Sequence, residues 1–414
     1  MSHPNRRAFL VAAAALAAFA DQARSMAQAP KREGASAATL EAIEQAETLI
    51  GVSFSARERE QLARTLGEQR AILAARRSRG WLPNTLAPAT TFDPRLPGTP
   101  TLRSTPDGDP GALPNSGWPL PGDESDVAFA PAWVQARWIR DGAISSAALT
   151  DLSLKRLQEA DPRLHCVITL TENLARRQAD AADRDAAAGR WHGPLHGVPW
   201  GCKDIIDTAD IRTTWGAEPW RDRVPARDAE VVARLHASGA VMVAKLAVGA
   251  LAYGDIWFGG KSRNPWDPER GSSGSSAGSA SATAAGLVGF SLGTETLGSI
   301  VSPSMECGTV GLRPTFGRVA RTGCMALCWS LDKIGAICRD SRDAALVLSI
   351  INGSDDSDPS SIDEPFVGDP GAPVDGLRLG IVPAWMSDGP TIDLDRATIE
   401  RLRHRGAVLV ERAV

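Results

Sequence analysis

The sequence lacks an excess of charge of either sign. Its 414 residues carry 45 basic and 49 acidic side chains, which gives a net charge of −4. A nucleic-acid-binding protein would need a basic surface, and a disordered acidic tail would need a run of like charges. We therefore expect no nucleic-acid partner, and a small molecule as the ligand.

The sequence also lacks the cysteine patterns of a metal site. None of its cysteines lies in a C-x-x-C pair, and none has histidines nearby, which argues against bound metal. We expect buried thiols, with a disulfide between Cys324 and Cys328 as the alternative, and no cofactor. The six cysteines are Cys166, Cys202, Cys307, Cys324, Cys328 and Cys338.

Lysine is scarce, because arginine supplies all but six of the 45 basic residues. Codon bias is one explanation. Lys203 nevertheless lies between Cys202 and the apolar pair Ile205 and Ile206, which is an unusual sequence environment for a charged side chain that faces water. The six lysines are Lys31, Lys155, Lys203, Lys245, Lys261 and Lys333.

The N-terminus has the pattern of an export signal. Arg6 and Arg7 precede an apolar run from Val11 to Ala20, which ends in small residues suited to cleavage. A run of about ten apolar residues is too short for a membrane anchor, which needs roughly 20. We predict twin-arginine export to the periplasm or the medium, with no stable membrane association afterwards. A cytoplasmic location is the alternative.

Composition divides the chain into four predicted segments. Residues 1–29 form the signal and cleavage region, and residues 30–80 a helical extension with apolar positions on one face. Residues 81–125 are dense in proline and glycine, which indicates a linker. Residues 126–414 form one large domain.

Helical and apolar segments alternate in the last of these segments. We predict strands at 167–170 and 240–244, and helices at 130–140, 173–188 and 229–237. This alternation is typical of an α/β fold with a central sheet covered by helices on both faces. Towards the end we predict a strand at 377–382, a helix at 397–404 and a strand at 406–414.

Two turns rich in serine and glycine, together with Lys203, carry the chemistry. The first runs from Arg270 to Ala280 and contains Ser275, and the second contains Ser299. The spacing between these serines is 299 − 275 = 24 residues. Together, Lys203, this 24-residue spacing and the two turns resemble the pattern of the amidase signature family. The resemblance extends from about residue 126 to residue 351. Members usually continue well past the point where this chain ends, so a mixed central sheet with an incomplete C-terminal part is expected.

The resemblance implies a role for each of these residues. Ser299 would be the nucleophile, Lys203 the base, and Ser275, preceded by a cis peptide bond, would pass the proton between them. Lys203 can serve as the base at neutral pH only if burial lowers its pKa. The backbone N–H groups of Thr296, Leu297, Gly298 and Ser299 would form the oxyanion hole. Supporting roles would fall to Ser276 and Ser279.

Other interpretations of the first turn are weaker. Runs of glycine and serine are usually flexible linkers, but the spacing to Ser299 argues against this here. Residues 274–278 also match the G-x-S-x-G elbow of α/β-hydrolases, with Ser276 as nucleophile. That elbow needs a preceding strand and a later histidine, whereas 270–273 make a poor strand and only His404 follows.

The chain departs from the family pattern at two positions beside Ser299. Leu297 replaces a glycine, which would add strain if the turn requires a positive φ. Val301 replaces an arginine, which favours apolar or aryl amides over acidic ones. Asp332, Arg313 and Arg339 could support the site, but such groups are more often structural, and we leave them out of the catalytic set.

The predicted function is hydrolysis of a small carboxylic amide to an acid and ammonia or an amine. The first alternative is the glutamine-hydrolysing subunit of a tRNA-dependent amidotransferase, which would work in the cytoplasm with partner subunits. The second is a truncated, non-catalytic relative.

Overall fold

The computed structural model describes residues 40–80, 82–84, 86–90, 117–366, 373–387, 389 and 391–412. The predicted export signal and most of the predicted linker lie outside these residues. The chain divides into two compact units, Met1–Pro83 and Asn84–Val414. Each unit is described by itself.

The described part of the first unit consists of two helices, α2 (Leu40–Ile50) and α3 (Ala56–Arg77). The sequence predicts a helical extension over residues 30–80, and its described part contains these two separate helices. The break occurs at Gly51, whose φ is +70°. Ser55 and Glu58 then form a reciprocal capping box that starts α3, which is a strong local signal for a new helix.

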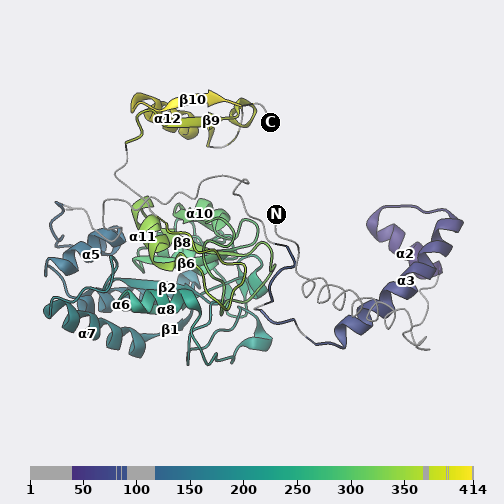
Figure 1. The fold of residues 1–414 in the computed structure, drawn as a ribbon, viewed down its shortest axis with the longest axis horizontal. Coiled ribbons are helices and arrows are strands. Elements are labelled where there is room, and N and C mark those ends of the chain that lie inside the picture. Colours follow the sequence, from purple (N-terminus) through teal and green to yellow (C-terminus); the bar gives the residue numbers. More distant parts are fainter. Residues whose placement is uncertain are drawn as a thin grey trace, which may run out of the picture. The chain divides into compact units, whose positions relative to one another are not determined.

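A six-stranded mixed sheet forms the centre of the second unit, in the order β1-β3-β2-β6-β8-β7 (Figure 1). Strand β2 runs parallel to both β3 and β6, whereas the pairs β1/β3, β6/β8 and β7/β8 are antiparallel. The strands are β1 (Val167–Leu170), β2 (Pro199–Lys203), β3 (Val241–Leu246), β6 (Phe290–Glu295), β7 (Val310–Leu312) and β8 (Lys333–Cys338).

Helices cover both faces of this sheet. The described helices of this region are α4 (Glu124–Phe129), α5 (Ala132–Arg140), α6 (Ser146–Leu164), α7 (Glu172–Ala187), α8 (Glu230–Ala237), α9 (Ala277–Ala284), α10 (Val301–Cys307) and α11 (Ser341–Ile351). Successive side chains of a strand point to opposite faces. Met242 of β3 accordingly joins a core with α5, α8 and α11, while its neighbours Val241 and Val243 join a core with α6, α7 and α9. The predicted covered mixed sheet is confirmed.

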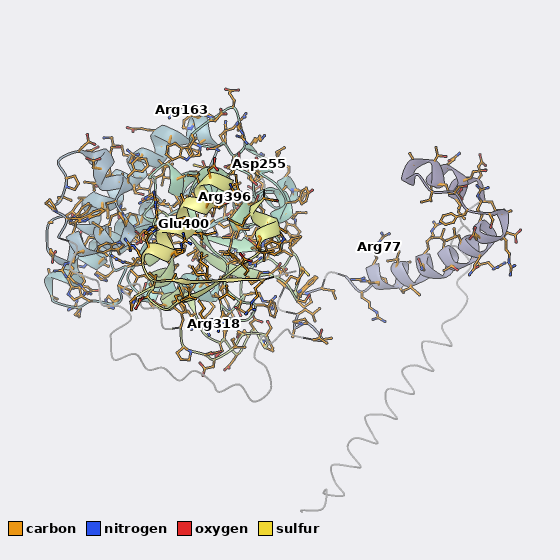
Figure 2. The ribbon with its side chains drawn as sticks, turned by 90° about the horizontal axis from the view of Figure 1, so that it is seen from above. Arg77, Arg163, Asp255, Arg318, Arg396 and Glu400 are labelled. Atoms are coloured by element: carbon orange, nitrogen blue, oxygen red, sulfur yellow. The ribbon has the colours of Figure 1, made fainter. Side chains whose placement is uncertain are left out.

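The remaining described elements are short or lie near the C-terminus. Strands β9 (Arg378–Ile381) and β10 (Val408–Glu411) pair in parallel, and α12 (Ile392–His404) connects them. Helix α12 buries none of its residues and carries charged side chains such as Arg396 and Glu400 (Figure 2). The small elements are η1 (Glu218–Trp220), η2 (Ala250–Ala252), η3 (Pro383–Met386), β4 (Ile256–Trp257) and β5 (Gly260–Lys261). Among the described residues, no helix combines the length and apolar character needed to cross a membrane.

Candidate active site

The candidate site lies at one edge of the sheet, where β2 and β6 end. Lys203 is the last residue of β2 and Glu295 the last of β6. Because these strands are parallel neighbours, their carboxyl ends meet at the same edge, which is where ligands bind in sheets of this kind. The loop before α9 brings Ser275 and Ser276 to this edge, and the turn after β6 brings Ser299.

The amine of Lys203 is enclosed by hydroxyl groups. Its Nζ lies 2.9 Å from Oγ of both Ser275 and Ser276, and 2.8 Å from Oγ1 of Thr294. It also donates to the carbonyl of Thr294 at 3.2 Å. The side chain is fully buried. Each of these groups can solvate an amine, but none is a carboxylate that would hold it charged.

Burial lowers the pKa of Lys203 from 10.5 to about 7. The cause is desolvation, which disfavours the ammonium form, and the more distant Cys324, Asp332 and Glu295 oppose it only in part. A substantial fraction of neutral amine therefore exists near pH 7. A neutral amine next to a serine hydroxyl can accept a proton from it.

The loop that carries Ser275 is fixed by backbone geometry. The Gly274-Ser275 peptide bond is cis, as the family resemblance implies. A side chain at Gly274 would collide with the carbonyl oxygen of Gly254, so glycine is required there. Ser276 Oγ donates to the carbonyl of Thr294 and accepts that residue's N–H, which joins the loop to β6.

Ser279 belongs to α9, on the side of the helix that faces β6. Its Oγ donates to the carbonyl of Leu292 at 2.9 Å. Ser291 in turn donates to the carbonyl of Ser279 at 3.0 Å. Ser279 therefore anchors the helix that follows the Ser275 loop and does not contact Lys203.

The turn that carries Ser299 needs one left-handed residue, and that residue is Gly298, with φ +90°. Leu297 does not adopt a positive φ. The replacement of glycine by leucine at 297 therefore adds no strain of the kind considered from the sequence. Its side chain instead projects outward and is 87% exposed.

Glu295 stabilises this turn through hydrogen bonds, and it was not identified from the sequence as a site residue. Its buried carboxylate accepts the N–H groups of Ile300 at 2.8 Å and Val301 at 3.0 Å. Arg313 pairs with its other oxygen at 3.0 Å. Burial raises the pKa of Glu295, but the backbone N–H groups of the turn and Arg313 outweigh this and hold the pKa below its usual value. The ionised carboxylate therefore fixes Gly298, which precedes Ser299, and Ile300 and Val301, which follow it.

Asp332 and Lys333 contact Thr296, the first residue of the turn. Asp332 Oδ1 accepts the Thr296 hydroxyl, and Oδ2 accepts the N–H groups of Leu327 and Cys328 at 2.8 and 2.9 Å. Lys333 Nζ donates to the Thr296 carbonyl at 3.1 Å. Asp332 thus lies in the site, whereas Arg339 donates to backbone carbonyls from Ala128 to Ala130 and at Thr283 and Val288, which makes it structural.

Ser275 and Ser299 line one pocket. Besides Thr294, Thr296 and Asp332, its walls include the side chains of Asn84, Ile205, Ala252, Arg321, Cys324, Met325, Ala326, Leu327, Lys333 and Ile334. The cavity volume is only about 10 Å³, which holds a single water molecule.

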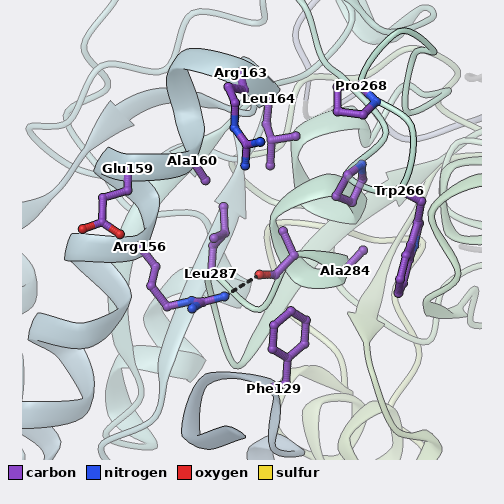
Figure 3. A pocket seen from close by; sticks show the side chains of 12 residues that line it. Phe129, Arg156, Glu159, Ala160, Arg163, Leu164, Trp266, Pro268, Ala284 and Leu287 are labelled. Atoms are coloured by element: carbon purple, nitrogen blue, oxygen red, sulfur yellow. Dashed lines mark hydrogen bonds between the residues drawn. The ribbon is translucent and has the colours of Figure 1, made fainter. Parts of the chain in front are cut away.

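A wider cavity of about 330 Å³ lies elsewhere on the unit and shares no residue with this pocket (Figure 3). Arg156 stacks on Phe129 there and donates to the backbone carbonyls of Ala285 and Gly286. Arg163 and Trp266 contribute further walls. It holds none of the sequence-predicted site residues, so the wider cavity is not the one that the sequence indicates.

All six cysteines are thiols in the structure, and five of them are buried. Cys324 lines the pocket, and burial raises the pKa of its thiol well above the usual range. Among the described residues, no group of three or more His, Cys, Asp or Glu side chains is arranged to hold a metal ion.

The chain is similar to known proteins in sequence and in fold. The family model described as amidase matches residues 148–413, and the chain belongs to this family. The A-type subunit of the glutamyl-tRNA(Gln) amidotransferase of Anaeromyxobacter sp. (strain K) is 42% identical over 279 residues, which cover 65% of this chain and 56% of the relative.

Solved structures show the same fold. The native peptide amidase from Stenotrophomonas maltophilia matches with a TM-score of 0.62 and 35% identity, over 69% of this chain and 62% of that one. An amidase family protein from Bacillus anthracis str. Ames matches with a TM-score of 0.64 and 28% identity, over 70% of this chain and 61% of that one. This chain therefore spans between half and two thirds of the length of these relatives.

Proposed function

We propose that the chain hydrolyses the C–N bond of a small carboxylic amide, with Ser299 as nucleophile, Ser275 as proton relay and Lys203 as base. The observation that carries this proposal is the buried amine of Lys203, 2.9 Å from Ser275 Oγ at the pocket that Ser299 lines. The lowered pKa of Lys203 supports its role as a base.

In the first half of the reaction Ser299 Oγ attacks the amide carbon. Its proton passes to Ser275 Oγ while the Ser275 proton passes to Lys203 Nζ, which becomes an ammonium. Collapse of the tetrahedral intermediate breaks the C–N bond. The same chain of groups then returns the proton to the leaving amine and leaves a Ser299 ester.

Backbone N–H groups of the turn 296–299 would stabilise the oxyanion. The N–H of Gly298 contributes to the low pKa of Glu295, so it faces that carboxylate. Leu297 and Ser299 therefore offer the better placed donors in this turn. Because Glu295 fixes the turn before substrate arrives, these donors need little reorganisation.

In the second half of the reaction water attacks the ester. Lys203, again neutral, takes the water's proton through Ser275, and Ser299 leaves with a proton as the acid is released. Every step uses side chains and backbone of this chain together with water, so the proposed chemistry requires no cofactor.

The relationship to amidotransferase subunits favours a second candidate. A glutamine-hydrolysing subunit would use the same three residues on the side-chain amide of glutamine and pass ammonia to a partner complex. The twin-arginine pattern at residues 6–7 supports the exported hydrolase instead, since tRNA-dependent amidation takes place in the cytoplasm.

The test is release of ammonia or amine from a panel of aliphatic amides, aryl amides and glutamine by the purified chain. We expect Ser299→Ala and Lys203→Ala to lower kcat by about 10⁴-fold or more, as loss of a nucleophile or its base does in other serine hydrolases. Ser349→Ala is the matched control, because among the described residues that hydroxyl donates to the backbone of its own helix, α11.

The outcomes separate the candidates. Turnover of simple amides that both active-site variants abolish supports the hydrolase. Turnover of glutamine alone supports the amidotransferase-type subunit. A folded parent protein that hydrolyses nothing in the panel would favour the truncated, non-catalytic relative.

A further inference from the structure

A second lysine lines the pocket. Lys333 is the first residue of β8 and lies opposite Glu295 of β6 in the sheet register. Its side chain is half-buried among the same walls as Ser275 and Ser299. The antiparallel pairing of β6 and β8 therefore places a cation directly beside the turn of the proposed nucleophile.

Lys333 still has hydrogen-bond donors to spare. A lysine ammonium has three donors, and within the described part of the chain Lys333 Nζ donates to the Thr296 carbonyl alone, at 3.1 Å. Lys203, by comparison, has four oxygen partners within 3.2 Å.

The other charged groups on the pocket wall are occupied. Asp332 uses both oxygens on Thr296 and on two backbone N–H groups. Arg321 pairs with Asp358 and also donates to Ser360 Oγ and the Trp329 carbonyl. Among the described residues that line this pocket, Lys333 is thus the charged side chain with the most unused donors, since Arg321 uses four of its five.

Within the described part of the chain, the hydrogen-bond partner of Lys333 is a carbonyl oxygen and not a carboxylate. Burial lowers the pKa of Lys333, and the nearby Arg313 guanidinium lowers it further, whereas Glu295 and Asp332 act in the opposite direction. Both of these carboxylates already accept hydrogen bonds from other groups, Glu295 from the Ile300 N–H and Asp332 from the Thr296 hydroxyl. A carboxylate from a ligand would restore the solvation that burial removes from the ammonium group, and charge-assisted hydrogen bonds of this kind are among the stronger ones.

We propose that Lys333 is a specificity-determining residue that binds a carboxylate on the acyl part of the substrate. The inference rests on the proposed amidase function and narrows its substrate class to monoamides of dicarboxylic acids. Such a substrate would place its amide carbon at Ser299 and its free carboxylate at Lys333. The reaction would release ammonia and a dicarboxylate.

This inference opposes the expectation drawn from Val301. The missing arginine at that position favoured apolar substrates, because no cation was expected beside the nucleophile. The sheet register supplies a cation from β8 instead, at a position that is distant in sequence from the serine motifs. The two expectations predict opposite substrate preferences.

The experiment compares succinamate with levulinamide, in which an uncharged acetyl group replaces the carboxylate at nearly the same size. We expect the full chain to prefer succinamate by about tenfold or more in kcat/KM, which is the scale of one hydrogen bond to a charged group. Lys333→Met should remove most of that preference, and Lys333→Arg should keep part of it. Lys155→Met is the control, because that lysine is exposed on α6 and pairs with Glu124.

The ratio between the two substrates is the decisive readout. Lys333 also holds the Thr296 carbonyl, so a purely structural role would lower both rates equally and leave the ratio unchanged. That result, or a parent enzyme without preference for succinamate, would overturn the inference while leaving the amidase function intact.

Binding to the Ser299→Ala protein provides a test that needs no turnover. Calorimetry should show tighter binding of succinamate than of levulinamide, and Lys333→Met in the same background should remove the difference. If the parent chain hydrolyses neither these two amides nor any other amide of the panel, the proposed function fails, and this measurement still decides whether Lys333 recognises a carboxylate. Equal binding of both compounds would rule that recognition out.

Discussion

At the scale of single residues, Lys203 determines how activity should depend on pH. Its pKa in the folded chain is depressed to about 7, so the neutral base predominates above that pH and the inactive ammonium below it. We therefore expect kcat/KM to fall about tenfold for each pH unit below 7 and to level off above it. Initial rates with an uncharged amide, between about pH 5 and 9, would measure this.

Circular dichroism across the same range is the control, since partial unfolding would also lower the rate. A rate that keeps rising tenfold per pH unit up to about pH 9 would mean that burial does not lower the pKa of Lys203 as described. A rate independent of pH would argue against a lysine base altogether.

Glu295 gives a second prediction at this scale. In Glu295, one carboxylate oxygen accepts the N–H groups of the turn and the other accepts Arg313. Glu295→Gln replaces one of these acceptor oxygens by an N–H₂ donor, which would then face either the turn or Arg313. We expect the free energy of unfolding to fall by about 2 kcal/mol and kcat to fall with it, because the oxyanion donors lose their support. Urea unfolding and initial rates would measure both effects.

Glu306→Gln is the matched control for Glu295→Gln. Glu306 lies near the end of α10 and pairs with Arg270, whose side chain is 65% exposed, and exposed ion pairs contribute little. Equal loss of stability in both variants would show that Glu295 gives the turn no special support.

The sequence was informative about those residues that share a motif. Lys203, Ser275 and Ser299 were identified from spacing and neighbours, and the structure brings Lys203 and Ser275 into contact. Thr294, Glu295 and Lys333 could not be assigned in this way, because their roles depend on which strands pair and in which register. A charged residue at the end of an apolar strand was the available signal for Glu295.

At the scale of elements, a buried ion pair joins β3 to the residue after β2. Asp204 and Lys245 are both fully buried, with Oδ1 and Nζ 3.8 Å apart. Thr214 donates twice to Asp204, while Lys245 donates to Thr208, Thr213 and the carbonyl of Ile206. Lys245→Met would leave Asp204 buried without its cation.

We expect Lys245→Met to lower the free energy of unfolding by about 3–5 kcal/mol, as measured for other broken buried pairs. The double variant Asp204→Leu with Lys245→Met should recover part of this loss, because no charge then remains buried. Urea unfolding of the three proteins gives the comparison. A double variant no better than Lys245→Met would show that the hydrogen bonds, not the buried charge, dominate.

Sequence pattern found some elements and missed others, for a physical reason. The strand predicted at 167–170 coincides with β1, and the helix predicted at 173–188 is α7, shifted by one residue. Helix α9 was not predicted, because its alanine, serine and glycine composition resembles a linker. Every residue of α9 is buried, and a side chain at Gly278 would collide with the backbone of Cys166 and Ala247. Small residues there permit close packing, which composition alone does not reveal.

At the scale of the whole molecule, the alternation of helices and apolar segments was sufficient to predict the covered sheet, but not the order of its strands. That order places β6 between β2 and β8. It thereby brings Lys203, the Ser299 turn and Lys333 to one edge, although these residues come from separate parts of the chain. The pocket that Ser275 and Ser299 line is therefore a property of strand order more than of any single motif.

The division into two units predicts that the first can be removed. Within Met1–Pro83, Ile43 is buried and Glu47 pairs with Arg59, so its described helices have contacts of their own. The apolar clusters that pack on the sheet contain no described residue before Val127. A chain that begins at Asn84 should therefore fold, with a melting temperature within about 2 °C of the full chain, since in a unit of this size a loss of 1 kcal/mol would shift it by about 1–2 °C.

Thermal unfolding followed by near-ultraviolet circular dichroism would measure this. A chain that begins after Arg140 is the contrasting control, because it lacks α5, whose Trp133, Val134 and Ile139 belong to the main core. Losing three large buried side chains costs several kcal/mol, a large part of the total stability of a domain. We expect that shorter chain to fail to fold. If the chain from Asn84 fails in the same way, the first unit contributes to the fold of the second, and the two do not fold independently.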